Sequence, residues 1–142
     1  MSSSAKVFGP AILHPAEIAA RERGGGVRTI PLVNARIGSA KTLSGITEFA
    51  PGAAVALHIH NCEETVIILE GEALAEIEGV EYALAATDTT WIPAGAPHRF
   101  RNPSAGRRLR IYWTYASIDA TRTVIATGVT TRIDEEHGVV PE

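Results

Sequence analysis

The sequence predicts an all-β fold, a double-stranded β-helix or jelly-roll barrel, with a short N-terminal arm. From Val27 onward, short strand-like segments follow one another about ten residues apart, separated by turn signals rich in Gly, Pro, Asn and Asp. No long helical pattern is present from which a βαβ unit could be built. The length of 142 residues suits one domain with a core of its own. Together these observations favour a closed or double-sheet β-barrel.

The chain divides into an arm at residues 1–26, a barrel at residues 27–128 and a tail at residues 129–142. In the arm, "HPAEIAARER" favours one or two helical turns, which the glycines at 24–26 end. Pro31 favours an edge or a bulge for the first barrel strand. The expected strands lie within 27–33, 42–52, 53–60, 65–71, 72–79, 80–95 (two strands around a turn), 98–102, 107–116 and 121–128.

Composition excludes several classes of protein. The formal net charge is −3, without the basic excess of a nucleic-acid binder, and the cluster Arg107, Arg108 and Arg110 is typical of a solvated strand face. The single cysteine, Cys62, excludes an intramolecular disulfide. The sequence shows neither the apolar core of a signal peptide nor a run long enough to span a membrane. We therefore expect a soluble, cytoplasmic protein with no nucleic-acid or membrane partner.

The stretch "HIHNCEE", residues 58–64, indicates a metal site. Residues i and i+2 of a strand project from the same face, so His58 and His60 can bind one ion. Glu64 follows a short turn and can approach from the next strand, although a turn one residue shorter would bring Glu63 instead. His98, at the start of another short strand, is the candidate for a fourth ligand.

Two motifs resemble those of the cupin superfamily. The first runs through "GAAVALHIHNCEETVIILEG" and the second through "PAGAPHRFRN". One position departs from the pattern: Thr87 stands where the second motif usually opens with glycine, and the adjacent Asp88 can build the turn through its own side chain. The matching positions are Gly52, His58, His60, Glu64, Gly71, Pro93, Gly95, His98 and Asn102.

The resemblance implies that His58, His60, Glu64 and His98 bind one divalent transition metal, Fe, Mn, Ni or Zn, inside the barrel. Glu63 is then a solvated or outer group. Cys62 is expected to be a small residue packed in a tight loop, and the alternative is a thiol near the rim of the metal site. His14 and His137 lie outside the motifs and are expected at the surface.

The pocket around the ion is expected to be apolar and open at one end. Phe100 shares a strand face with His98, and Trp91 and Trp113 are further candidates for its wall. Tyr115 and Arg110 are candidates for substrate contact, but they lie in opposite strand phases, so a regular strand cannot direct both inward.

Such a site suits an enzyme that acts on a small oxygenated molecule, with a dioxygenase ranked first. An isomerase, cyclase or lyase that uses the metal as a Lewis acid comes next, polyketide-cyclase-like or sugar-isomerase-like proteins being examples. A cupin that binds a small ligand without turnover is the alternative. Exposed sheet edges and the arm favour a symmetric homodimer.

Overall fold

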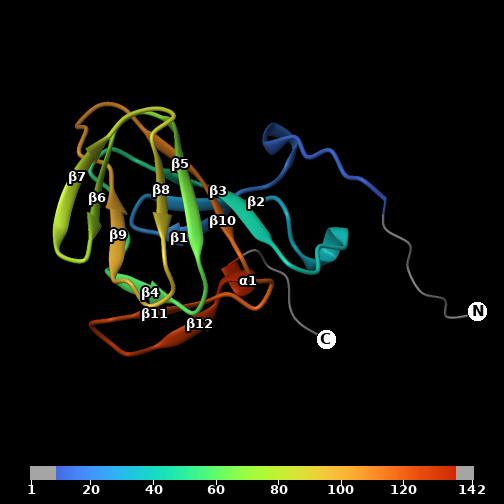
Figure 1. Ribbon diagram of the computed structural model, residues 1–142. Helices are drawn as coiled ribbons and strands as arrows, with labels where there is room; N and C mark the ends of the chain where they lie inside the picture. The colour runs from blue at the N-terminus through green and yellow to red at the C-terminus, as the bar shows by residue number, and fades with distance from the viewer. Residues whose placement is uncertain (1–8, 137–142) are drawn as a thin grey trace, which may run out of the picture.

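The structure, a computed structural model, describes residues 9–136 and is built from two antiparallel six-stranded sheets that face each other (Figure 1). This confirms the predicted all-β jelly-roll class. In order across the first sheet lie β1 (Arg21–Gly24), β2 (Val27–Pro31), β3 (Leu43–Phe49), β10 (Leu109–Tyr115), β5 (Glu64–Glu70) and β8 (Thr89–Ile92). Across the second lie β12 (Thr130–Arg132), β11 (Thr121–Val124), β4 (His58–His60), β9 (His98–Arg101), β6 (Ala73–Ile77) and β7 (Val80–Leu84).

Both sheets extend beyond the predicted barrel. Strand β1 lies in the predicted arm but pairs with β2, Arg21 opposite Thr29, so β2 is not an edge strand. Strand β12 lies in the predicted tail and pairs with β11. Of the helical turns expected in the arm, only the 3-10 turn Pro15–Glu17 forms, because the residues after it enter the sheet.

The remaining helices are short. They are the 3-10 turn Ala35–Ile37 and α1 (Ile133–Glu136). Within residues 9–136, no helix has both the length and the apolar character needed to cross a membrane.

The main core lies between the two sheets, and strand β10 shows how the sequence builds it. Its residues alternate between buried and half-buried positions, as the sequence pattern predicts. Leu109, Ile111, Trp113 and Tyr115 point between the sheets, and the indole Nε1 of Trp113 donates a hydrogen bond to Oγ1 of Thr47, 2.8 Å away. This alternation places Trp113 and Tyr115 in the interior of the barrel.

A second, smaller core lies on the outer face of the first sheet. Ile30, Leu32 and Ile46 are buried there, and Leu13 and Ile18 of the arm pack against them. The arm therefore covers the part of this sheet face that these residues form. Each sheet has two edge strands, β1 and β8 in the first and β12 and β7 in the second. An exposed edge can pair with another chain, and on this ground the homodimer stays a prediction.

In the turn between β7 and β8, Thr87 occupies the position where the second motif usually has glycine. Thr87 adopts φ = 75°, a left-handed conformation that is unusual for a β-branched residue. The Asp88 carboxylate accepts a hydrogen bond from the backbone N–H of Ala85, at 2.8 Å, and closes the turn as predicted.

We predict that Thr87→Gly raises the free energy of unfolding by about 1 kcal/mol. Relief of the left-handed strain outweighs the greater entropy that glycine gives the unfolded chain. Urea denaturation measures the change. Ala86→Gly, in the same exposed turn but without a positive φ, is the control and should destabilise the protein. Equal losses in the two variants would contradict the strain argument.

Candidate metal centre

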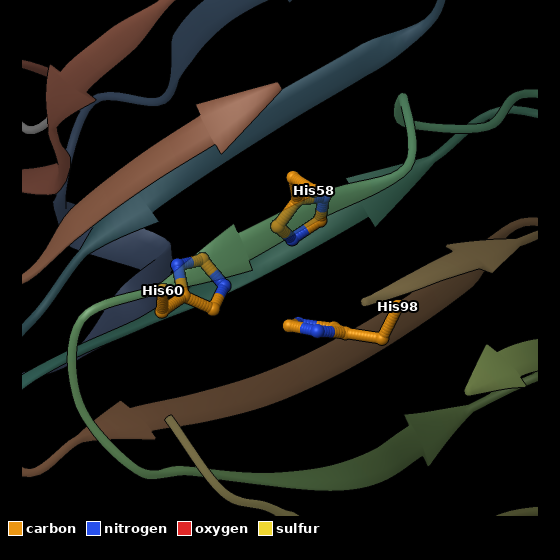
Figure 2. A group of neighbouring side chains, drawn as sticks. All are labelled: His58, His60 and His98. Atoms are coloured by element: carbon orange, nitrogen blue, oxygen red, sulfur yellow. The ribbon is translucent and has the colours of Figure 1, made fainter. Parts of the chain in front are cut away.

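Three imidazoles meet between the sheets. Strand β4 places His58 and His60 on one face, and antiparallel pairing with β9 sets His98 opposite His58. The ring centroids lie 4.5–4.9 Å apart, and one nitrogen of each ring lies within 4.8 Å of the others (Figure 2). All three residues are buried. Side chains distant in sequence are thus brought within reach of one ion.

The backbone orients all three rings. Nδ1 of His58, His60 and His98 lies 2.6, 2.8 and 2.9 Å from the carbonyl oxygens of Ala56, Thr121 and Ala96. A carbonyl oxygen can only accept, so each Nδ1 carries the proton and donates. The Nε2 atoms are therefore available to a metal, an arrangement common among metal-binding histidines.

Glu64 completes the cluster from the start of β5. Its carboxylate is buried, with Oε1 3.0 Å from Nε2 of His98 and 3.4 Å from Nε2 of His60. Two ligands at right angles on an ion with bonds of about 2.1 Å would lie about 3.0 Å apart, and tetrahedral ligands about 3.4 Å. The Glu64 oxygen is therefore spaced from these two nitrogens as neighbouring ligands of one ion are.

A proton or a metal ion must lie between the Glu64 carboxylate and the imidazole nitrogens that face it. A carboxylate oxygen and an imidazole lone pair repel unless a proton or a metal ion lies between them. Burial raises the pKa of Glu64, but the interactions of its carboxylate with His60 and His98 outweigh this effect, and the pKa falls below its ordinary value. Burial, followed by the charge of Arg122, lowers the pKa of His58 to about 2, so this imidazole stays neutral, as a metal ligand must be.

Phe100, Trp113 and Tyr115 line the same small cavity, about 30 Å³ in volume, as the cluster. The Tyr115 hydroxyl lies 3.3 Å from Nε2 of His60. Burial, followed by the charge of Glu64, raises the pKa of Tyr115 well above its ordinary value. The phenol therefore remains protonated at neutral pH and can donate a hydrogen bond into the cavity.

The prediction of Trp91 as a pocket residue is wrong. Its side chain is 62% exposed, and its Nε1 donates to Oε1 of Glu63, 2.9 Å away, on the outside. The cause is strand phase: on β8 the inward residue is Ile92, which pairs with Glu64, and Trp91 pairs with Thr65 on the opposite face.

The prediction of Arg110 as a substrate contact is also wrong. It lies on the opposite face of β10 from Tyr115, and its Nε donates to the Glu48 carboxylate at 2.8 Å. Strand phase therefore selects Tyr115 alone of the two candidates.

The other residues singled out by the sequence lie away from the cluster. Glu63, the rival carboxylate, is exposed, and so is His14. Cys62 is half-buried and packs against the main core, and burial raises the pKa of its thiol. His137 lies outside the described residues.

Sequence reasoning missed six residues of the cavity wall, and two of them, Arg23 and Arg122, are charged. Arg122 pairs with His60 across β11 and β4, and opposed residues of antiparallel strands share a face. Arg23 comes from β1, in the segment predicted to be an arm. Only the strand pairing could have revealed either residue, because neither stands in a motif.

Comparison with known proteins agrees with this architecture. The chain is 34% identical over 83 residues to polyketide synthase CurC of Streptomyces cyaneus, covering 58% of this chain and 53% of that protein. It is 33% identical over 75 residues to quercetin 2,3-dioxygenase of Bacillus subtilis, covering 52% of this chain and 22% of that protein. The chain thus spans about half of the first relative and under a quarter of the second.

Among solved structures, the polyketide cyclase RemF of Streptomyces resistomycificus superposes with a TM-score of 0.72 at 17% identity. The match covers 94% of this chain and 89% of that one, which establishes similarity of fold. The family model described as "Cupin domain" matches residues 45–115, half of the chain. With its two facing sheets and its three-histidine cluster, the chain belongs to the cupin superfamily.

Proposed function

We propose that this protein is a metal-dependent enzyme that acts on a small oxygenated organic molecule and uses its ion as a Lewis acid. The observation that carries the proposal is the protonated Tyr115 hydroxyl, which lies 3.3 Å from His60 and lines the same cavity as the cluster. A donor beside a Lewis acid suits proton-transfer reactions at a carbonyl, such as isomerisation, cyclisation or lysis.

His58, His60, Glu64 and His98 would hold the ion. The three close imidazoles with their fixed tautomers, and the Glu64 oxygen beside two of them, fit a divalent transition metal. Bound there, the ion would polarise a substrate oxygen as a Lewis acid. The donor set suits Fe, Mn, Ni and Zn.

Tyr115 would act on the substrate oxygen. Its phenol keeps its proton and can donate a hydrogen bond to an oxygen on which negative charge develops. Trp113 and Phe100 form apolar walls that limit water around this donor. A fixed donor in such surroundings stabilises the transition state more than it stabilises a neutral ground state.

Dioxygenation, which the sequence alone ranked first, is the second candidate. Its support is the likeness to quercetin 2,3-dioxygenase, whereas the likeness to the polyketide cyclase covers far more of both chains. Tyr115 favours proton transfer, because activation of dioxygen by iron needs no protonated phenol at this place. A binding protein without turnover is the third candidate.

The test is turnover under argon by zinc-loaded protein. We expect accelerated deuterium exchange at the carbon between the carbonyls of a 1,3-diketone, in a panel that also holds catechols and hydroxy acids. Zinc has no redox chemistry, so exchange without oxygen supports the Lewis-acid proposal. Oxygen uptake by iron-loaded protein, with no anaerobic exchange, would shift the conclusion to a dioxygenase. Tight binding of a panel member without any change to it would favour a binding protein.

We predict that Tyr115→Phe lowers the exchange rate about 100-fold and leaves the metal content unchanged, since it removes only the hydroxyl. Tyr112→Phe is the matched control, because Tyr112 lies on the same strand but faces away, with its hydroxyl 3.3 Å from Oγ of Ser44. Equal rates in the two variants would remove Tyr115 from the mechanism.

A further inference from the structure

His60 is held differently from the other two histidines of the cluster. Nδ1 of His58 and Nδ1 of His98 each face the carbonyl oxygen of the residue two positions earlier in the chain. Nδ1 of His60 instead faces the carbonyl oxygen of Thr121, which is 61 residues later and 2.8 Å away. Thr121 also lies beyond residues 45–115, the region that the cupin family model matches. The orientation of the His60 ring therefore depends on a segment that is distant in the sequence.

The Thr121 peptide lies just beyond the strand pairing between β4 and β11 (Figure 1). This pairing ends with Arg122 opposite His60, which is also the last residue of β4. Beyond it, side chains take the place of backbone partners. The N–H of Thr121 donates to Oδ1 of Asn61 at 2.9 Å, and its carbonyl oxygen accepts from the ring of His60. Two consecutive side chains thus hold both polar backbone groups of Thr121.

Asn61 contacts the same segment at a second point. Its Nδ2 donates to the carbonyl oxygen of Asp119 at 3.2 Å. Asparagine suits this place because its side-chain amide offers an acceptor and a donor together. The two contacts fix the segment 119–121 against the end of β4, so that the Thr121 carbonyl stays directed at His60.

The segment is also anchored on the side of β12. Nη2 of Arg132 donates to the Asp119 carboxylate at 3.0 Å, and the N–H of Ile133 donates to the carbonyl oxygen of Ala120 at 2.9 Å. Ala120 and Ile133 are both buried in the main core. The segment is therefore held firmly on one side by the C-terminal strand, and Asn61 holds its other side.

We propose that Asn61 is a positioning residue of the metal centre, because it fixes the Thr121 peptide whose carbonyl oxygen orients the His60 ring toward the ion. An outer contact that orients a ligand raises the affinity of a site for its metal. The inference rests on the metal ligands of the proposed function but not on the proposed reaction. Asn61 is itself exposed, so water can replace its hydrogen bonds and their contribution to stability is small.

The experiment compares Asn61→Ala with the wild type by zinc titration and by NMR of the full-length protein before and after zinc loading. We expect the zinc affinity to fall about 10-fold, at the low end for outer contacts, because Asn61 acts through a peptide group. The backbone N–H of Thr121 and the ring N–H of His60 should exchange faster with solvent. The ring signals of His58 and His98 should stay unchanged, and the Tm of the metal-free protein should change little.

Asn34→Ala is the matched control, because it removes the same kind of side chain from the connection between β2 and β3, outside the cluster. Oδ1 of Asn34 accepts a hydrogen bond from the N–H of Arg36 at 3.0 Å and caps the 3-10 turn Ala35–Ile37. Loss of a cap destabilises the fold. This variant should therefore lower Tm and leave the zinc affinity unchanged, the reverse of the pattern expected for Asn61→Ala.

Unchanged zinc affinity in Asn61→Ala would overturn the proposal even if the Thr121 amide exchanged faster, because the contact would then not position the ligand. An equal loss of zinc affinity in Asn34→Ala would also overturn it, since general destabilisation would explain both results. Weaker zinc binding together with faster exchange at His60 would support it even if the protein failed to catalyse anaerobic deuterium exchange. A wild type that binds no zinc would refute both the metal centre and this role of Asn61.

Discussion

His60→Ala is expected to lower the affinity of the protein for a divalent ion by more than about 100-fold. The variant removes one of three imidazoles whose nitrogen atoms lie within 4.8 Å of one another, and it leaves the Glu64 carboxylate with one imidazole partner. Loss of an outer hydrogen-bond partner alone costs metal sites about 10- to 100-fold, and loss of a ligand should cost more. Titration with Zn²⁺ or Mn²⁺ and elemental analysis measure the change.

His14→Ala is the matched control, because His14 is exposed and lies outside the cluster. Its metal content should equal that of the wild type. Full metal occupancy in His60→Ala would contradict the assignment of this residue as a ligand.

Gly71→Ala should lower the free energy of unfolding by about 3 kcal/mol or more, the largest stability effect we predict. Gly71 adopts φ = 85°, and a Cβ there would lie 2.4 Å from the carbonyl oxygen of Arg108. Neither the left-handed backbone nor the adjacent β10 backbone can adjust cheaply, so strain adds to a steric clash. Denaturation in urea measures the loss.

Gly79→Ala separates the two contributions. Gly79 has φ = 81°, but a Cβ there would have no atom within 4 Å. This variant should lose about 1 kcal/mol from backbone strain alone. If both variants lost the same amount, the close approach of the Arg108 carbonyl would not be the reason for the motif glycine.

Most of the barrel was predictable because its sequence carries two strong local signals. Alternation placed Trp113 and Tyr115 on the same face of β10, which the structure shows to be the inner one, and the motif spacing predicted that His58, His60 and His98 come together. Asn102 shows that a motif residue need not take part in chemistry. Its buried Nδ2 donates to the carbonyl oxygens of Phe49, Ala50 and Arg107 and ties the end of β9 to the end of β3.

The wrongly predicted pocket residue and the two missed arginines lie on strands whose inner face is decided by pairing with other strands. Trp91 belongs to a short end strand whose phase is fixed by pairing with β5, and nothing local shows which face is buried. Arg23 and Arg122 reach the cavity only because β1 joins β2 and β11 joins β4. Charged residues in an apparent arm and a late strand look like solvated groups until the sheets are assembled.

The measurement that tests the metal centre most directly is X-ray absorption spectroscopy on zinc-loaded protein, combined with elemental analysis. We expect one ion per chain, with three imidazole nitrogens and one carboxylate oxygen at about 2.0–2.2 Å. A spectrum without the scattering of imidazole rings, or a protein that takes up no ion, would contradict the shared site of His58, His60, Glu64 and His98.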